Sequence, residues 1–242
     1  MTLEINGTAS DGWEPLIDQF ASNFDRYSEL GASVCVTYEG ETVVDVWAGD
    51  RDTEGNPWLE DTIAVVNSCT KGAVALACHL LADRGLLDLD APVAEIWPEF
   101  AHGAKAAVTT RMMLNHTTGV AAFREDLPEG SAFDWDYMCD RVAAEEPWWS
   151  PGTRNGYHLM SFGWVAGELV RRASGLSLGT FFREQLAEPA AADFWIGLPA
   201  EEHHRVSPLM PFRPGPEEDF SAFTRAFIAD ADGLQARAWR NR

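Results

Sequence analysis

The sequence predicts a mixed α/β (α+β) fold, in which an antiparallel sheet flanked by helices is joined to a mostly helical region. Apolar residues recur at helical spacing over residues 12–29. Alternating residues then lie on both sides of a Glu39-Gly40-Glu41 turn, which is typical of a β-hairpin: Val34, Val36, Tyr38, Val44, Val46 and Ala48. A helix that leads into a hairpin favours a helix packed on an antiparallel sheet.

After residue 60 helical patterns dominate. They predict helices over residues 69–84, 110–115, 135–145, 158–173 and 178–187. An isolated hairpin is marginal in water, and no later block of alternating residues offers it a partner strand. We therefore expect an incomplete sheet in this chain. The last segment, RAFIADADGLQARAWRNR, is polar and is interpreted as helical or disordered.

We expect one domain over residues 1–242, which is long enough to bury a sizeable core. Residues 1–60 would form the helix and hairpin of the sheet layer, and residues 61–242 the mostly helical region that carries the functional motifs.

Composition excludes several classes of partner. The chain has 38 Asp and Glu against 18 Lys and Arg, a net charge of −20, which repels phosphates. We expect no nucleic-acid partner and no membrane partner, because no apolar stretch reaches membrane-spanning length. The beginning, MTLEINGTASDGWEPL, has neither a basic start nor an apolar run, so a secretory signal is not indicated. The four cysteines form no C-x-x-C pair, so neither a zinc site nor a disulfide framework is indicated. These features favour a cytoplasmic location.

Ser68 and Lys71 stand three residues apart at the start of an apolar helical pattern. Residues i and i+3 share a helix face, about 5–6 Å apart at Cβ, so the ammonium can reach the hydroxyl. A buried lysine has a lowered pKa and can assist a base, and a serine becomes a nucleophile once its proton is removed. The alternative is an N-cap serine beside a lysine that extends to water.

Three stretches extend this motif: SCTKGAVALACHLLADRGLLDLDAPVAEIWPEF, RMMLNHTTGVAAF and PWWSPGTRNGYHLMSFGWVAGELVRRASGLSLGTFFREQLAEP. In this order they resemble the serine β-lactamase-like superfamily, in the branch of class C β-lactamases and family VIII carboxylesterases. S-x-x-K carries the nucleophile of such enzymes. The resemblance covers residues 60–198 and implies a β-lactamase-like fold, with the chain similar to the N-terminal two thirds of a longer family member.

The resemblance also implies that Tyr157, which follows a Pro-Gly loop, is the general base. A free tyrosine has a pKa of about 10, so a cation must lower it, and Lys71 supplies that charge. Tyr157 would then take the proton of Ser68 and return it to the leaving group. The alternative is an aromatic anchor at a helix start.

The sequence departs from the β-lactamase pattern beside this tyrosine. Those enzymes usually carry Tyr-x-Asn, whereas here the third position is Leu159. The asparagine helps to hold the amide of a lactam, so its replacement favours the esterase branch. The intervening His158 is either a hydrogen-bond donor behind the catalytic residues or a polar residue at a helix start.

The third family motif, a triplet such as Lys-Thr-Gly on a strand beside the nucleophile, is not found. His116-Thr117-Thr118-Gly119 sits where the family has a His-Thr-Ser-Gly turn, and we interpret it as a helix end with a glycine cap. The N–H of Ser68 would form one side of the oxyanion hole. Loss of the second donor costs about 10²–10³ in turnover.

Other motifs have simpler interpretations. Gly175-Leu176-Ser177-Leu178-Gly179 matches a nucleophile elbow, but a helical pattern precedes it, so Ser177 is interpreted as an N-cap. An α/β-hydrolase would instead combine Ser177 with Asp193 and His203 or His204, which no strand–helix alternation supports. Glu201-Glu202-His203-His204 could bind a metal, although a solvated loop is favoured. Four tryptophans could line an acyl pocket or serve as anchors: Trp148, Trp149, Trp164 and Trp195.

These observations favour a serine hydrolase that acts on a small-molecule ester or amide through an acyl-enzyme, most of all a carboxylesterase. The catalytic residues would be Ser68, Lys71 and Tyr157 in a dry pocket, with no cofactor and no metal. The alternatives are a β-lactamase, D-amino peptidase or acyltransferase of the same superfamily and, in another class, a truncated non-catalytic binding fold. The sequence does not define the oligomeric state.

Overall fold

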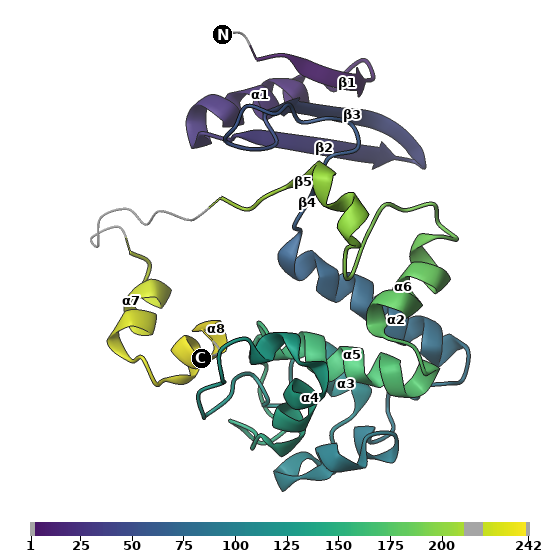
Figure 1. Cartoon of the computed structure of the whole chain (residues 1–242), viewed down its shortest axis with the longest axis vertical. Coiled ribbons are helices and arrows are strands. Elements are labelled where there is room, and N and C mark those ends of the chain that lie inside the picture. Colours follow the sequence, from purple (N-terminus) through teal and green to yellow (C-terminus); the bar gives the residue numbers. More distant parts are fainter. Residues whose placement is uncertain (1–2, 211–219, 241–242) are drawn as a thin grey trace. The chain divides into compact units, whose positions relative to one another are not determined.

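A computed structural model describes the fold (Figure 1). The described residues are 3–210 and 220–240. The chain folds into two compact units, residues 1–66 with 198–213, and residues 67–197 with 214–242. The expectation of one domain stays a prediction.

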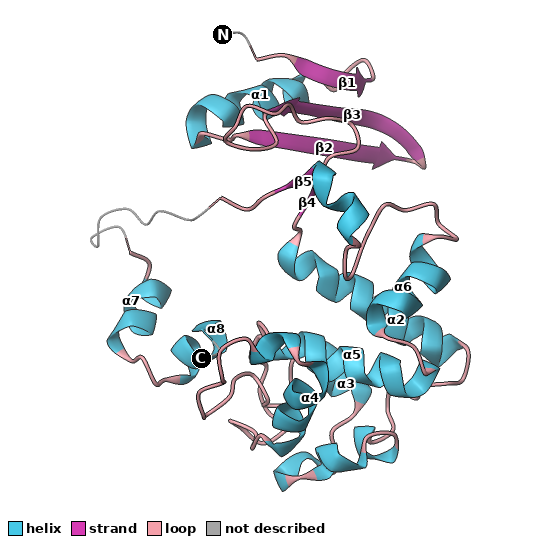
Figure 2. Cartoon of the chain, in the orientation of Figure 1, coloured by secondary structure: helices cyan, strands magenta, loops and turns pink. Residues whose placement is uncertain are grey.

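The first unit is built on a three-stranded antiparallel sheet of order β1-β3-β2, counted over the described residues (Figure 2). Its elements are β1 (Ile5–Ala9), α1 (Glu14–Tyr27), β2 (Gly31–Tyr38) and β3 (Glu41–Gly49). The inward residues Val44, Val46 and Ala48 of β3 pack with Phe20 of α1. The predicted helix and hairpin are confirmed, because apolar residues at helical and alternating spacing meet on these two faces.

Strand β1 was not predicted. Its sequence, INGTA, has one large apolar side chain, so the alternation that identifies a strand is missing. It pairs with β3 along its whole length, from Ile5 opposite Ala48 to Ala9 opposite Val44. Gly7 has a φ of +99°, and a Cβ there would lie 2.0 Å from the Asp45 carbonyl oxygen, so the close backbone approach requires glycine. The hairpin therefore finds its partner before the helix rather than after it.

A separate parallel pair in the same unit joins β4 (Ile63–Ala64) to β5 (Val206–Ser207). Neither strand joins the larger sheet. Within the described ranges, that sheet stops at three strands, in line with the expectation of an incomplete one.

The second unit is organised around α5 (Ser161–Ser174), which contacts α2 (Thr70–Asp83), α3 (Thr110–Leu114), α4 (Trp135–Ala144) and α6 (Leu178–Phe182). One apolar cluster lies between α5 and α4, and a second lies between α5 and α2. A helix that is apolar on two sides needs this central position. The five predicted helices are confirmed, and α6 continues as the π-helix Arg183–Ala187.

Short 3₁₀ segments connect these helices: Asn67–Cys69, Val93–Glu95, Pro98–Ala101, Gly103–Lys105, Ser131–Phe133 and, in the first unit, Ala200–Arg205. The last segment of the chain is helical, with α7 (Ala222–Ala229) and α8 (Leu234–Arg240), while residues 241–242 lie outside the described ranges. Among the described residues, no helix has both the length and the apolar character that a membrane span requires.

Helix α5 carries a buried carboxylate, Glu168, whose side chain is fully buried. It accepts hydrogen bonds from Trp135 Nε1 at 2.9 Å, Arg171 Nε at 2.7 Å and Arg172 Nε at 2.7 Å. Burial raises its pKa, but the hydrogen bonds from the arginines and Trp135 outweigh burial and lower the pKa to about 2. Its ionised form therefore stabilises the fold fully at pH values above the ordinary pKa of a glutamate. This contribution is lost as the pH falls toward the lowered pKa of about 2.

We expect Glu168→Gln to lower the free energy of unfolding at pH 7 by about 3 kcal/mol, because two arginines lose a shared buried partner. Glu188→Gln, which breaks the exposed pair with Arg183, is the matched control and should change it by less than about 1 kcal/mol. Urea unfolding at pH 7 and pH 3 measures both. The difference between Glu168→Gln and the unsubstituted chain should shrink at pH 3, and a pH-independent difference would contradict the assigned charge state.

Candidate active site

Ser68 and Lys71 lie where the chain enters α2. Ser68 is in the 3₁₀ turn Asn67–Cys69, and Lys71 is in the first turn of the helix. Lys71 Nζ donates to Ser68 Oγ at 3.1 Å and to the Leu159 carbonyl oxygen at 2.9 Å. The N-cap position is Cys69 and has no side-chain cap, so Ser68 is not the N-cap of this helix. The ammonium lies between two protein acceptors, unlike a lysine that extends to water.

Tyr157 lies four residues before α5 and meets the same pair. Lys71 Nζ is 4.8 Å from the centre of its ring. Burial raises the pKa of Tyr157, but side-chain hydrogen bonds with Ser68 and Lys71 and the charge of Lys71 outweigh burial, so the pKa lies below its ordinary value. The structure thus brings the hydroxyl, the ammonium and the phenol together, and their catalytic roles stay predictions.

The expectation of a buried lysine in a dry pocket is wrong for this structure. Ser68 is exposed, Lys71 is half-buried and Tyr157 is 48% exposed. Ser68 and Lys71 border a cavity of about 670 Å³ that is walled by α2, the start of α5 and Trp239 of α8. The described residues of this unit supply only helices and loops to the cavity, so no strand covers Ser68 within it.

A second, largely apolar cavity of about 300 Å³ lies against Tyr157. It shares Leu159 and Trp239 with the first cavity, so the two cavities adjoin at these residues. Trp149 and Phe223 are also in its wall. An apolar cavity next to a nucleophile is suited to an apolar substituent of a substrate.

Of the four tryptophans considered as pocket residues, Trp149 is the one found in the wall of this cavity. Trp164 packs against the core cluster around α4. Trp148 Nε1 donates to the Ala122 carbonyl oxygen at 2.8 Å, and Trp195 is stacked by Arg183, with the guanidinium carbon 4.2 Å from its ring centre. The latter three are anchors of core or loop, which is the ordinary role of single tryptophans.

His158 is fully buried beside the tyrosine, and α5 begins only at Ser161. Its Nδ1 lies 2.6 Å from the Gly156 carbonyl oxygen and its Nε2 lies 2.6 Å from Thr118 Oγ1. Because a carbonyl oxygen only accepts, Nδ1 carries the proton and Nε2 accepts from the threonine hydroxyl. Burial lowers its pKa to about 4, so the ring is neutral at pH 7. His158 thus ties the tyrosine loop to residue 118 and is not a surface residue at a helix start.

The interpretation of Gly119 as a helix cap is wrong. Helix α3 ends in a Schellman motif in which Thr117 N donates to Met112 O at 2.9 Å and His116 N donates to Met113 O at 3.3 Å. The left-handed residue of that motif is His116, with a φ of +64°. Gly119, with a φ of +81°, is needed instead for close packing, because a Cβ there would lie 2.6 Å from the Trp149 carbonyl oxygen.

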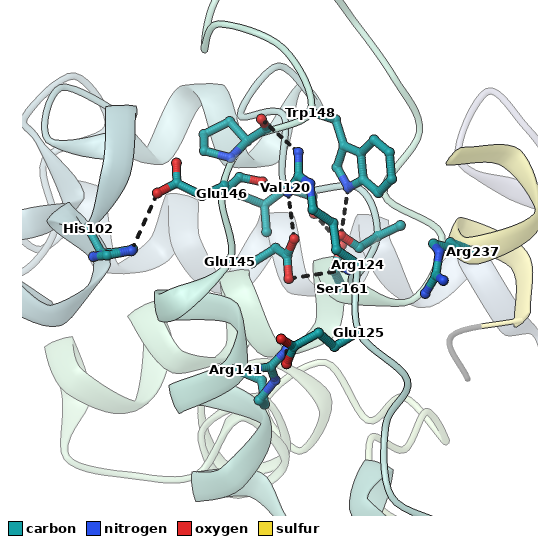
Figure 3. Close-up of polar contacts among 12 residues, drawn as sticks. His102, Val120, Arg124, Glu125, Arg141, Glu145, Glu146, Trp148, Ser161 and Arg237 are labelled. Carbon is teal, nitrogen blue, oxygen red and sulfur yellow. Dashed lines mark hydrogen bonds and ion pairs between the residues drawn. The ribbon is translucent and has the colours of Figure 1, made fainter. Parts of the chain in front are cut away.

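An arginine network holds the loop after Gly119 in place (Figure 3). Arg124 donates to the buried Glu145 carboxylate at 2.6 Å, to the Glu146 carbonyl oxygen, and to the Pro147 carbonyl oxygen at 3.2 Å. In the same loop the Val120 carbonyl oxygen accepts from Ser161 Oγ at 2.7 Å. Residues 116–124 are therefore bonded to both ends of the loop that carries Tyr157.

The remaining motifs take structural roles. Ser177 Oγ accepts from Thr180 N at 3.1 Å as the N-cap of α6, and helix α5 precedes it where a nucleophile elbow needs a strand, so the N-cap interpretation is confirmed. Among described residues, no group of three or more His, Cys, Asp or Glu side chains is arranged to hold a metal ion. His204 Nδ1 instead lies 2.7 Å from the Glu201 carbonyl oxygen.

Sequence comparison relates the chain to known proteins. Residues 17–234 match the Beta-lactamase family. The chain is 38% identical over 209 residues to "Esterase/beta-lactamase LipL" of Mycobacterium tuberculosis, covering 85% of this chain and 48% of that protein. It is 34% identical over 181 residues to "Esterase EstB" of Burkholderia gladioli, covering 66% of this chain and 45% of that one. The chain thus spans about half the length of these curated relatives.

Solved structures give the same relation. A crystal structure of a family VIII carboxylesterase is 44% identical with a TM-score of 0.81, covering 86% of this chain and 58% of that one. A penicillin-binding protein homolog from Caulobacter crescentus is 39% identical with a TM-score of 0.84, covering 88% of this chain and 58% of that one.

Proposed function

Because this chain belongs to the beta-lactamase family, we propose that it is a serine hydrolase that cleaves carboxylic esters through an acyl-enzyme at Ser68. The observation that carries the proposal is the position of Lys71 Nζ, 3.1 Å from Ser68 Oγ and 4.8 Å from the Tyr157 ring centre. One cation in that position both orients the nucleophile and favours the phenolate beside it.

The reaction follows from these contacts. Tyr157 in its phenolate form removes the Ser68 proton while Oγ forms a bond to the ester carbonyl carbon. The Ser68 N–H faces the developing oxyanion, and collapse of the intermediate breaks the ester C–O bond. The departing alkoxide takes the proton from Tyr157. Water then attacks the acyl-serine by the same proton path, which releases the acid and restores Ser68.

Reaction of the folded chain with a fluorophosphonate, followed by peptide mapping, tests this function. The reagent forms a P–O bond at an activated serine and loses fluoride. We expect one adduct, located on Ser68. Folded protein that stays unlabelled would contradict the proposal and support the alternative, a non-catalytic binding fold. That alternative is favoured by one observation, the absence of a covering strand over Ser68 among the described residues of its unit.

We propose an ester rather than a lactam as substrate. Leu159 stands where β-lactamases usually carry the asparagine that holds the lactam amide, and it lines two adjoining cavities, one of them largely apolar. Proteins named esterase or carboxylesterase are among its relatives. The apolar cavity of about 300 Å³ suits a small apolar acyl or alkoxy group.

A substrate panel tests this preference. Turnover of p-nitrophenyl butyrate should exceed that of nitrocefin by about 10²-fold in kcat/KM, since a site rejects an amide whose polar groups it leaves unpaired. Leu159→Asn keeps the carbonyl oxygen that binds Lys71, and it should shift the ratio toward nitrocefin. The matched control is Leu86→Asn, an exposed leucine outside both cavities. Fast nitrocefin turnover without ester turnover would overturn the choice of substrate.

We propose a cytoplasmic location as well. Its support is the state of the four cysteines, all free, with Cys35 and Cys69 exposed as thiols that a reducing compartment would preserve. Fractionation of cells that express the natural protein, with immunodetection in each fraction, tests this location. Recovery in an exported fraction would contradict it.

A further inference from the structure

His116 touches the chain on both sides of Tyr157. Its carbonyl oxygen accepts from the Gly156 N–H at 3.1 Å, and its Nδ1 accepts from the His158 N–H at 3.2 Å. Its ring lies against the tyrosine ring, with 4.8 Å between ring centres. One residue thus binds the peptide groups before and after Tyr157 as well as its aromatic face.

The conformation of His116 indicates that its side chain is needed there. It is the left-handed residue that ends α3, with a φ of +64°, a position at which glycine is the ordinary choice. A helix end alone gives no reason for a histidine. The contacts of its ring with Tyr157, His158 and Phe162 provide one.

We propose that His116 is a positioning residue, which holds Tyr157 in proton-transfer contact with Ser68 through its carbonyl oxygen and its unprotonated Nδ1. The inference rests on the proposed function and deepens it. His116 makes no bond to the reacting atoms and acts through the tyrosine. Because Nδ1 is an acceptor in this contact, the neutral ring must carry its proton on Nε2.

The contact makes the site sensitive to acid. Protonation of His116 at Nδ1 would place an N–H group opposite the His158 N–H. Two donors cannot bond to each other, so the hydrogen bond from His158 N–H to Nδ1 would be lost. Burial and the charge of Lys71 hold the pKa of His116 below its ordinary value, so the neutral ring persists at pH 7 and the bond is lost only as the pH falls through that lowered pKa. The titratable groups that face the ring are Lys71, Tyr157 and His158. His158 is itself neutral at pH 7, because burial lowers its pKa to about 4.

Three substitutions separate the contacts. Asparagine tolerates the left-handed conformation and places Oδ1 at the same number of bonds from the backbone as Nδ1, so His116→Asn keeps an acceptor but loses the ring and its titration. His116→Gly keeps the helix end and loses both acceptor and ring. His79→Asn, on the exposed face of α2, is the control.

Amide hydrogen exchange followed by NMR measures the hydrogen bond between the His158 N–H and His116 Nδ1 without requiring catalysis. We expect the His158 N–H to lose protection in His116→Gly and to keep it in His116→Asn. The Gly156 N–H should stay protected in both, because its acceptor is backbone. Unchanged protection of the His158 N–H in His116→Gly would overturn the proposal. This test does not depend on catalysis, because a chain that fails to react with the fluorophosphonate contradicts the proposed function and not the contact.

The rate of fluorophosphonate labelling at Ser68 measures how the loss of the His116 contacts changes the reactivity of the nucleophile. We expect His116→Gly to react about tenfold more slowly, as the loss of one hydrogen bond at the tyrosine would cause. His116→Asn should stay within about threefold of the unsubstituted chain and lack the fall in rate that protonation of the ring causes below the ordinary histidine pKa of about 6.5. Equal rates and equal pH profiles in His116→Gly and the unsubstituted chain would show that His116 only ends a helix, and would overturn the proposal.

Discussion

Ser68→Ala is expected to abolish the fluorophosphonate adduct and to lower ester hydrolysis by at least about 10⁴-fold, because no other group replaces the attacking oxygen. The fold should be unchanged, since Ser68 is exposed and caps no helix. Lys71 keeps its second acceptor, the Leu159 carbonyl oxygen at 2.9 Å. Intact-mass spectrometry and circular dichroism of the same sample measure both expectations.

Ser177→Ala is the matched control, because Ser177 belongs to the competing G-x-S-x-G motif. It should lose the cap of α6 and about 1 kcal/mol of stability while keeping the adduct and the turnover. Labelling that survives in Ser68→Ala and disappears in Ser177→Ala would reverse the assignment of the nucleophile.

Tyr157→Phe is expected to lower kcat/KM for an ester by about 10³-fold, within the range of general acid–base catalysis. Phenylalanine keeps the ring packed on His116 and beneath Lys71, at 4.8 Å in both contacts, so the substitution removes the proton carrier alone. Tyr38→Phe, at an exposed position of the sheet, is the control and should have no effect.

The dependence of activity on pH provides a second test of Tyr157 as the base. The phenolate of Tyr157 becomes more abundant as the pH rises. Because the net effect of its surroundings lowers the pKa of Tyr157, this happens at a lower pH than for a free tyrosine. Activity should therefore rise with pH in the unsubstituted chain, and the residual activity of Tyr157→Phe should lack this limb. A variant that keeps both full activity and the limb would show that another group is the base.

Local patterns predicted the parts of this protein that depend on neighbours in sequence. Helical spacing locates α1, α2 and α5, and alternation locates β2 and β3. The Ser68–Lys71 contact follows from the geometry of one helical turn. The quoted motifs implied the family and its β-lactamase-like fold, and both are confirmed.

Contacts between distant segments were not predictable in this way. Strand β1 has no alternation of its own and is defined by its pairing with β3. The exposure of Ser68 depends on which segments surround α2, and the role of His116 depends on a contact with residues at least 40 positions away in the chain.

The sequence by itself determined the helices, the hairpin and the serine–lysine pair, because each depends on spacing within one turn or one strand pair. Only the tertiary structure decided where Tyr157 lies, what holds it, and how open the nucleophile is. Those properties arise when segments 40 to 90 residues apart exchange hydrogen bonds, as Lys71 does with Leu159 and His116 with His158. Every residue except proline carries the same backbone donor and acceptor, so the identities of residues in the chain do not reveal which of these groups will pair.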